Sequence, residues 1–290
     1  MTTFFSPAKI NLLLDIHGKR EDGYHDLSSL IVGLDFGDFI NIKKIKGSED
    51  LLECNDPSIP CDENNLILKA MALLRKEIPI DQYFKFSLNK KIPSQAGFGG
   101  GSSNATTAIK GVLDLTGENL PSENLNALLS QIGADCSFFQ NPVSSMMTGK
   151  GEVIEPLEPS ISDKLKGQKI IIFKPSFNIS TAVAYHELGE DSFKSKTHTT
   201  QKIEEFKNTG AYNTLIHNSF SKPLEHKYIA LKSLLITLND HEIPSMISGS
   251  GSGCFSLLSR ENTNNQRIFI KDCVKNAFGK GAFLEETQIL

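Results

Sequence analysis

The sequence predicts an α+β protein of two domains, and three observations support this prediction. The segment 84–89 alternates apolar and polar residues and is followed by glycines and a helical pattern. A second alternating segment lies at 9–16. A stretch rich in proline, serine and charge follows at 155–165, in a chain of 290 residues that is long enough for two domains. We therefore expect domains at 1–155 and 156–290.

In the first domain we expect strands at 9–16, 27–34 and 38–46 and helices at 64–76 and 121–133. The tripeptide Asp35-Phe36-Gly37 matches the metal-binding motif of protein kinases. In protein kinases that motif follows both a glycine loop and an HRD segment, whereas here it precedes the glycines and no HRD is present. We interpret the tripeptide as a turn between two strands.

The second domain begins with a buried strand at 169–173, which Pro175 ends. Helices are expected at 181–188, 211–221 and 226–238, and the polar segment 192–203 is expected to be a mobile loop. The sequence SGSGSG at 248–253 lies between two apolar segments and so joins two strands. From the pattern alone it is either a hairpin turn or a loop that brings backbone N–H groups to an active site.

Composition argues against several classes of protein. The chain is 39% hydrophobic and 22% charged with a net charge of −4, so a basic surface for nucleic acid or anionic membrane is not indicated. No apolar run reaches membrane-spanning length, and the first residues do not resemble a signal or transit peptide. We expect a cytoplasmic protein without nucleic-acid or membrane partners.

The cysteines and histidines form no recognisable motif. The five cysteines are scattered and include no CxxC pair, so we expect free thiols in a reducing compartment. The seven histidines form no HExxH or similar cluster, and we assign no protein-bound metal.

The stretch 93–106, PSQAGFGGGSSNAT, is the most informative part of the chain. Glycines let backbone N–H groups approach phosphate oxygens, and the start of a helix adds unpaired donors and a favourable dipole. Ser102 and Ser103 either contact phosphate or its metal, or cap the helix. The loop is neither a Walker A motif nor a dinucleotide fingerprint, because it lacks the Lys-Ser/Thr ending and a third GxGxxG glycine. A flexible surface turn is the alternative.

Three segments resemble the three motifs of the GHMP small-molecule kinases: PAKINL at 7–12, the glycine loop, and ISGSGSG at 247–253. GKREDGYHDLSSL at 18–30 and GADCSFF at 133–139 resemble the branch of that family whose substrate is 4-diphosphocytidyl-2-C-methyl-D-erythritol. The segments agree in order and spacing over essentially the whole chain.

The resemblance implies a two-domain α+β fold with the active site in the cleft between the domains. It implies an N-terminal domain like domain 2 of ribosomal protein S5 and a C-terminal α/β sandwich. It also implies ATP-dependent phosphorylation of the 2-hydroxyl of the substrate, in the non-mevalonate route to isoprenoids. ATP is the implied co-substrate, Mg²⁺ is expected with it, and we expect a monomer or weak homodimer.

The resemblance also assigns site residues. Lys9 and Asp135 match the catalytic pair, Asn11 lies beside them, and Asn65 matches a position near adenine. The cytidine is assigned to Tyr24 and His25, with Tyr185 as a further aromatic. The residues assigned to ATP phosphates are Pro93, Ser94, Gln95, Ala96, Gly97, Phe98, Gly99, Gly100, Gly101, Ser102 and Ser103.

Each assignment has a structural alternative. Asp135 follows a helix-stopping glycine and is either a general base or the cap of a short helix at 136–139. Lys9 on a strand is otherwise a solvated edge residue. Tyr24 and His25 are otherwise part of a turn after Asp22-Gly23, and Tyr185 is otherwise an ordinary residue at the edge of a core.

Some positions depart from the family pattern. Gln95 stands where glycine is common, Phe98 where leucine is usual, Asn104 where aspartate is frequent, and Thr214 where relatives carry an acidic residue. Two rival functions are another GHMP kinase, of the homoserine or mevalonate type, and a nucleotide-binding protein without turnover. The Gly-Tyr-His segment argues against the first rival, and the presence of both Lys9 and Asp135 argues against the second.

Overall fold

A computed structural model describes residues 1–259 and 261–290, and their packing divides the chain into two compact units. Unit 1 comprises Met1–Ala8, Phe36–Ser94 and Gly99–Pro142. Unit 2 comprises Lys9–Asp35, Gln95–Phe98 and Val143–Leu290. Each unit is therefore assembled from separate stretches of chain. The predicted domain limits, 1–155 and 156–290, remain a prediction.

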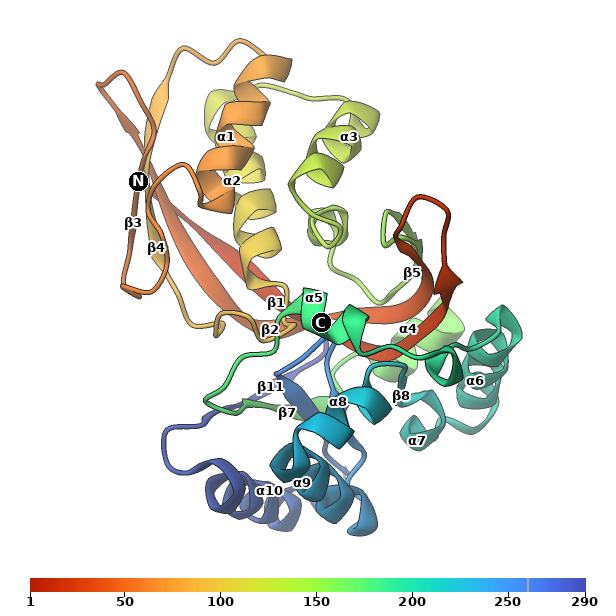
Figure 1. The fold of residues 1–290 in the computed structure, drawn as a ribbon. Helices are drawn as coiled ribbons and strands as arrows, with labels where there is room; N and C mark the ends of the chain where they lie inside the picture. The colour runs from red at the N-terminus through yellow and green to blue at the C-terminus, as the bar shows by residue number, and fades with distance from the viewer. Residues whose placement is uncertain (260) are drawn as a thin grey trace. The chain divides into compact units, whose positions relative to one another are not determined.

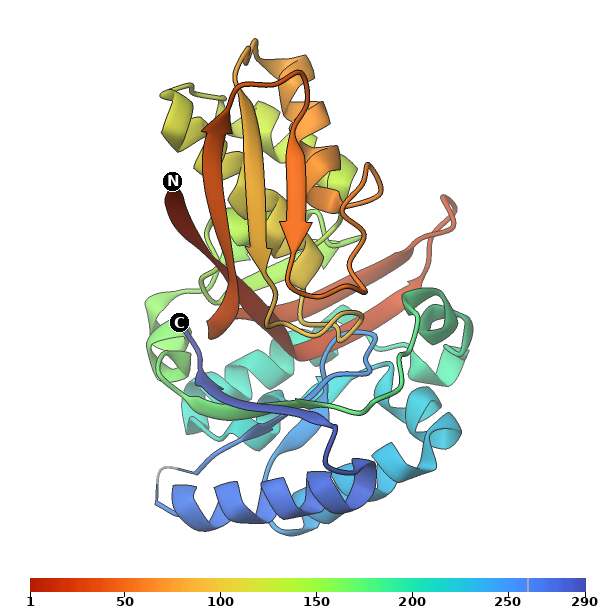
Figure 2. The same cartoon turned by 90° about the vertical axis from the view of Figure 1, so that its left-hand side faces the viewer.

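Unit 1 is a sheet with helices on one face (Figures 1 and 2). The strand order is β3-β4-β2-β1. The strands are β1 (Thr2–Lys19), β2 (His25–Ile45), β3 (Leu51–Cys54) and β4 (Tyr83–Asn89). The helices are α1 (Leu66–Glu77), α2 (Gly100–Thr116), α3 (Ser122–Ile132) and the 3₁₀ turn η1 (Ser137–Gln140). The strand at 84–89 and the helices at 64–76 and 121–133 are confirmed.

The core of unit 1 explains why these segments take these forms. Phe84 and Phe86 alternate along β4 with half-buried polar residues and are themselves fully buried. They meet Ala70 and Leu74 of α1 and Ile109 of α2 in one apolar cluster. The 2.0 period of a strand and the 3.6 period of a helix each place one apolar face toward that cluster.

β2 runs unbroken from His25 to Ile45, so the prediction of two strands with a turn at Asp35-Phe36-Gly37 is wrong. Gly37 lies within the strand, where a Cβ atom would stand 2.2 Å from the backbone oxygen of Ser6. Glycine is present because the neighbouring strand β1 approaches closely there, and the chain does not reverse.

Unit 2 contains two sheets (Figure 1). In the first, the strand order is β6-β5-β2-β1-β8, and in the second it is β11-β7-β10-β9. The additional strands are β5 (Ser145–Gly149), β6 (Val153–Pro156), β7 (Lys169–Lys174), β8 (His217–Asn218), β9 (Ser245–Ile247), β10 (Cys254–Leu257) and β11 (Phe283–Gln288). The predicted strand at 169–173 and the joining role of SGSGSG, between antiparallel β9 and β10, are confirmed.

The helices of unit 2 correct two predictions. They are α4 (Pro159–Leu165), α5 (Thr181–His186), the 3₁₀ turn η2 (Glu190–Ser192), α6 (Lys196–Thr209), α7 (Tyr212–Leu215), α8 (Ser221–Lys227), α9 (Ile229–Asp240) and α10 (Thr263–Phe278). The segment 192–203, predicted as a mobile loop, contains the last residue of η2 and the first half of α6. The segment 211–221, predicted as one helix, is broken by strand β8.

α6 escaped prediction because its apolar face is almost absent. Ser195 caps its start by accepting a hydrogen bond from the His198 N–H at 3.2 Å, and Gly210 ends it in a left-handed conformation. Thr199 and Phe206 are its buried residues. Caps and tertiary contacts, with little help from amphipathic periodicity, therefore stabilise this helix.

Within residues 1–259 and 261–290, none of the helices is both long enough and apolar enough to cross a bilayer.

Candidate active site

The glycine-rich loop leaves β4 and enters α2 through a series of left-handed residues. Gln95, Gly97 and Gly99 have φ angles of 53°, 73° and 71°. Gly99 is the N-cap of α2, so the first turn begins at Gly100, and the alternative in which Ser102 or Ser103 caps the helix is wrong. The N–H groups of that first turn have no intrahelical partner, which is the arrangement that binds an anion.

Gln95 departs from the glycine common at this position in the family that the sequence resembles. Its φ of 53° is one of two positive values among the described non-glycine residues. A left-handed conformation costs glycine less than any other residue. The loop therefore keeps the backbone that glycine would favour, with a small energetic cost at Gln95.

The loop serines occupy different environments. Ser103 is fully buried, and its hydroxyl accepts a hydrogen bond from the Ser6 hydroxyl at 2.8 Å. Ser102 is half-buried beside the Cys136 thiol. The hydroxyl oxygen of Ser94 is inaccessible and has no hydrogen-bond partner among the described residues. Ser102 is thus the better placed of the two helix serines to meet a ligand.

A buried carboxylate that the sequence did not indicate fixes the backbone just before the glycine loop. Asp38 is fully buried, and its Oδ1 accepts hydrogen bonds from the backbone N–H groups of Lys91 and Ile92 at 2.7 and 2.8 Å. Its Oδ2 accepts from Lys90 Nζ and, at 2.8 Å, from Asn104 Nδ2. An aspartate at position 104 would place its carboxylate against that of Asp38, and the two negative charges would repel. The Asn104 amide instead donates a hydrogen bond to Asp38.

Lys9 and Asn11 lie together in unit 2, and neither is a solvated edge residue. Their exposed fractions are 4% and 3%, because both faces of β1 are covered there. Lys9 Nζ donates to Asn11 Oδ1 at 2.7 Å, and Asn11 Nδ2 donates to the Ser29 hydroxyl at 2.8 Å. The Ser29 hydroxyl then donates to the Leu13 backbone oxygen at 2.7 Å. This chain of hydrogen bonds orients the Lys9 ammonium group.

The second glycine loop approaches the same pair. A Cβ atom on Gly249 would lie 3.3 Å from Asn11 Oδ1 and 3.7 Å from Lys9 Nζ. The Asn218 side-chain amide fixes this loop by donating to the backbone oxygens of Ile247 and Gly249, both at 2.9 Å. Asn218 gave no signal in the sequence, because its partners lie about thirty residues away and no motif contains it.

Asp135 lies in unit 1, in the turn between α3 and η1, and is half-buried. The N-cap of η1 is Cys136, which makes no side-chain cap bond. The assignment of Asp135 as a general base stays a prediction. The turn is closed by a hydrogen bond from the Cys136 N–H to the Gly133 oxygen at 3.0 Å. The Thr106 hydroxyl donates to the Cys136 oxygen at 2.9 Å, which ties the turn to α2.

Cys136 itself is not a reactive group. Burial raises the pKa of its thiol to about 11, despite the hydrogen bond with Ser102. A thiol with so high a pKa is neutral at pH 7 and a poor nucleophile.

The aromatic residues assigned to cytidine occupy two environments in unit 2. Tyr24 follows a turn in which Asp22 accepts its N–H at 3.2 Å, and 62% of its surface is exposed. His25 opens β2, with its ring centroid 5.0 Å from that of Tyr185, which makes an edge contact with Phe220. Burial and then the charge of Lys19 lower the pKa of His25, so its imidazole is neutral at pH 7.

Asn65 is the N-cap of α1 and is nearly buried. Its Oδ1 accepts from the Ile67 N–H at 2.9 Å, and its Nδ2 donates to the Pro60 oxygen at 2.7 Å. The start of α1 lies beside the glycine loop, because a Cβ atom on Gly101 would stand 3.2 Å from Leu66 Cδ1. Its position near the loop agrees with the assignment to ATP, which remains a prediction.

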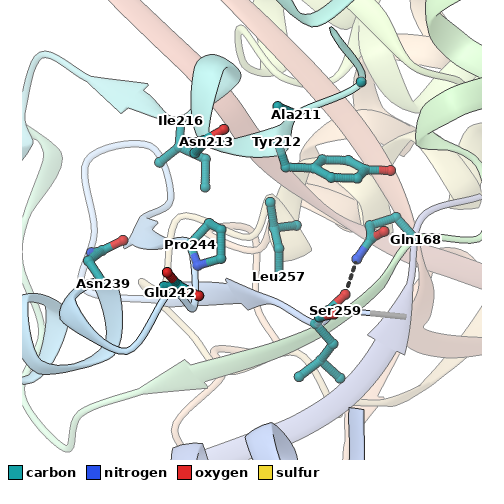
Figure 3. A pocket seen from close by; sticks show the side chains of 12 residues that line it. Gln168, Ala211, Tyr212, Asn213, Ile216, Asn239, Glu242, Pro244, Leu257 and Ser259 are labelled. Atoms are coloured by element: carbon teal, nitrogen blue, oxygen red, sulfur yellow. Dashed lines mark hydrogen bonds between the residues drawn. The ribbon is translucent and has the colours of Figure 1, made fainter. Parts of the chain in front are cut away.

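A cavity of about 580 Å³ in unit 2 contains none of the residues assigned from the sequence (Figure 3). Tyr212, Asn239 and Glu242 are among the residues that line it, and Gln168 crosses one end by donating to the Leu258 oxygen at 2.7 Å. We assign it no role in the site.

Comparison with known proteins identifies close relatives. The family described as GHMP kinases N terminal domain matches residues 65–148. A 4-diphosphocytidyl-2-C-methyl-D-erythritol kinase of Protochlamydia amoebophila is 40% identical over 253 residues, which cover 87% of this chain and 83% of that protein. The chloroplastic enzyme of that name from Arabidopsis thaliana is 35% identical over 279 residues, covering 94% and 71%.

Solved structures confirm the predicted α+β GHMP kinase fold. The crystal structure of a 4-(cytidine 5′-diphospho)-2C-methyl-D-erythritol kinase matches with a TM-score of 0.80 at 24% identity, over 99% of both chains. That of a mevalonate kinase matches with a TM-score of 0.68 at 16% identity, over 100% of this chain and 99% of that one.

Proposed function

Because the chain belongs to the family of 4-diphosphocytidyl-2-C-methyl-D-erythritol kinases, we propose that it transfers the γ-phosphoryl group of ATP to the 2-hydroxyl of 4-diphosphocytidyl-2-C-methyl-D-erythritol. The products are ADP and the 2-phosphate, within the non-mevalonate route to isoprenoids. The observation that carries the proposal is 40% identity to a kinase of this name over 83% of its length. The buried Lys9–Asn11 pair and the helix-entering glycine loop supply chemistry that fits it.

The glycine loop binds the phosphates of ATP in this proposal. Gly100 and Gly101 open the first turn of α2, so its N–H groups point at a ligand without a side chain in the way. A Mg²⁺ ion bound with ATP would supply neutralisation of the phosphate charge. The half-buried hydroxyl of Ser102 is the group of the loop that fits such an ion, since the Ser103 hydroxyl is bonded to Ser6.

Asp135 acts as the general base, and Lys9 stabilises charge. The Asp135 carboxylate accepts the proton of the substrate 2-hydroxyl as its oxygen attacks the γ-phosphorus, and the bond to the leaving ADP oxygen breaks. The Lys9 ammonium group, oriented by Asn11, offsets the negative charge on the transferred phosphoryl group. Positioning and charge neutralisation supply most of the rate enhancement in such a reaction.

The cytosine stacks on the exposed ring of Tyr24. The rings of His25 and Tyr185 are 5.0 Å apart, while a base between two rings needs about 7 Å, twice a van der Waals contact. Lys150 Nζ lies 4.9 Å from the centroid of Tyr24 and covers one face of that ring. The opposite face of Tyr24 therefore receives the base, and the neutral imidazole of His25 lies next in the chain to contact its polar edge.

An ADP-release assay with and without the diphosphocytidyl substrate tests this function. We expect release that depends on this substrate, and only background release with homoserine or mevalonate. Turnover of one of those compounds at a higher kcat/KM would assign the chain to a different GHMP kinase activity. ATP binding without release of ADP for any substrate would indicate a nucleotide-binding protein without turnover.

We further propose that the protein works in the cytoplasm as a monomer or weak homodimer. Light scattering of the purified chain across a range of concentrations tests the oligomeric part of this proposal.

A further inference from the structure

Three residues with metal-binding side chains meet in unit 2, although they are far apart in the sequence. Asp15 lies on β1, His198 near the start of α6 and His217 on β8. Asp15 Oδ1 is 2.7 Å from His217 Nδ1, and Asp15 Oδ2 is 2.8 Å from His198 Nδ1. The potential ligand atoms of the three residues all lie within 4.8 Å of one another. The proposed kinase chemistry uses none of them.

Backbone structure fixes where the three side chains stand. β8 pairs in parallel with β1, with Leu13 opposite His217, so His217 lies beside the strand that carries Asp15. The Ser195 cap accepts the N–H of His198 at 3.2 Å and so holds that residue in the first turn of α6. The two imidazole rings are steeply inclined at 70° with centroids 4.8 Å apart, so they converge on the carboxylate instead of stacking.

The cluster contains two buried polar atoms without hydrogen-bond partners. Asp15 is fully buried, yet neither its Oδ1 nor His217 Nδ1 makes a hydrogen bond among the described residues, although the two atoms lie 2.7 Å apart. Leaving such atoms unpaired is costly, and a bound cation would give each of them a bond. Oδ2 is oriented by the Thr199 hydroxyl, which donates to it at 2.6 Å, as an outer partner of a metal ligand does.

We propose that Asp15, His198 and His217 bind one Zn²⁺-like divalent transition-metal ion. Two imidazoles and one carboxylate suit Zn²⁺ or Co²⁺, whereas Mg²⁺ prefers oxygen ligands alone. Bonds of about 2.0–2.2 Å in a tetrahedron require the ligand atoms to separate by roughly 0.5 Å from their present contacts. The histidine side chains are 29% and 24% exposed, so water can complete the coordination. The ion holds α6 and β8 against β1 and is separate from the Mg²⁺ that accompanies ATP.

Metal binding by the purified 290-residue chain tests the proposal directly. The protein is treated with a chelator, freed of it, and titrated with Zn²⁺ and with Co²⁺. We expect one ion per chain, a Kd for Zn²⁺ of about 1 µM or lower, and the intense visible bands of four-coordinate Co²⁺. An excess of Mg²⁺ should not displace the ion. Wild-type protein that binds no stoichiometric Zn²⁺ at micromolar concentration would overturn the proposal without reference to any variant.

Variants locate the site. His198→Gln and His217→Gln should each weaken Zn²⁺ binding at least 100-fold, whereas the matched control His226→Gln, on an exposed residue of α8, should bind as the wild type does. Thr199→Val should weaken binding about tenfold through the loss of carboxylate orientation, and Thr199→Ser should restore it. Equal loss of binding in His226→Gln, or none in the His198→Gln, His217→Gln double variant, would place the metal elsewhere and reject these ligands.

Discussion

The two glycine-rich loops of this chain have similar compositions and different tasks. The loop at 93–101 ends in the first turn of α2, where Gly100 and Gly101 leave backbone N–H groups open to a ligand. In the loop at 248–253, the Gly253 N–H donates to the Ala96 oxygen at 3.1 Å, and the Gly251 N–H donates to the Ser248 oxygen at 3.0 Å. In the proposed function, Gly100 and Gly101 of the first loop let a ligand approach, whereas Gly253 of the second loop lets another segment of the chain approach.

Contacts between residues 95–98 and 248–253, all within unit 2, show what the second loop does. A Cβ atom on Gly97 would lie 2.3 Å from the Ser248 oxygen, and one on Gly253 would lie 2.3 Å from the Ala96 oxygen. The hydrogen bond from the Gly253 N–H to the Ala96 oxygen and the one from the Ser248 hydroxyl to the Gly97 oxygen therefore join SGSGSG to the first glycine loop. Of the two interpretations left open by the pattern, the hairpin turn is confirmed, because the segment joins antiparallel β9 and β10. Gly249 of this turn approaches Asn11 and Lys9.

The largest loss of activity is expected when the proposed general base is removed and both glycine loops are left unchanged. Asp135→Asn should lower kcat by roughly 10²–10⁴, because the amide cannot accept the proton of the substrate hydroxyl. Urea unfolding and ATP affinity should match the wild type, and the exposed Asp163→Asn on α4 serves as the control. Turnover near that of the wild type in Asp135→Asn would remove this residue from the mechanism.

Gly253→Ala tests the packing role of the second loop. The added methyl group would stand 2.3 Å from the Ala96 oxygen and 2.5 Å from Phe98 Cζ, so the free energy of unfolding should fall by about 1–3 kcal/mol. The midpoint of urea unfolding reports this loss. Gly281→Ala, where a Cβ atom meets nothing within 4 Å, should unfold as the wild type does. Equal midpoints for the two variants would contradict the close packing of the loops.

Tyr24→Ala alters neither loop and so tests whether the remote end of the substrate has its own binding site. Loss of the stacking surface should reduce kcat/KM for the diphosphocytidyl substrate by about 1–3 kcal/mol, with KM for ATP unchanged. Tyr24→Phe keeps the ring and should stay close to the wild type. A silent Tyr24→Ala would show that the cytosine binds elsewhere.

Gly101→Ala should have the smallest effect. In contrast to Gly253→Ala, it should weaken ATP binding and leave the free energy of unfolding unchanged. Alanine favours a helix, and its methyl group meets only the flexible end of Leu66, at 3.2 Å, so stability should hold. The methyl group narrows the approach to the N–H groups, and the Kd for ATP measured by calorimetry should rise about tenfold. Gly100 is a poorer choice, since its Cβ would stand 2.7 Å from the buried Lys90 ammonium group. An unchanged Kd would mean that this turn does not bind phosphate.

Elements with one apolar face were predictable from the sequence. β4, α1, α2 and α3 show clear periodicity, glycine follows α2 and α3, and the structure contains all four elements. The glycine loop could be found because a strand, its glycines and a helix start are adjacent in the chain. The catalytic assignments of Lys9 and Asp135 came from resemblance to a family, and periodicity alone would have left Lys9 on a solvated edge.

Local sequence therefore determined the elements whose pattern is amphipathic, the order of the motifs and the family to which they belong. Tertiary structure alone decided that both faces of β1 are covered, which buries Lys9, Asn11 and Asp15. It also decided that a helix forms at 196–209 around Phe206, and that Asp15 meets two histidines about two hundred residues away. The physical reason is that a short window reports which face of an element is apolar. Burial of a polar side chain depends instead on what distant segments pack against it.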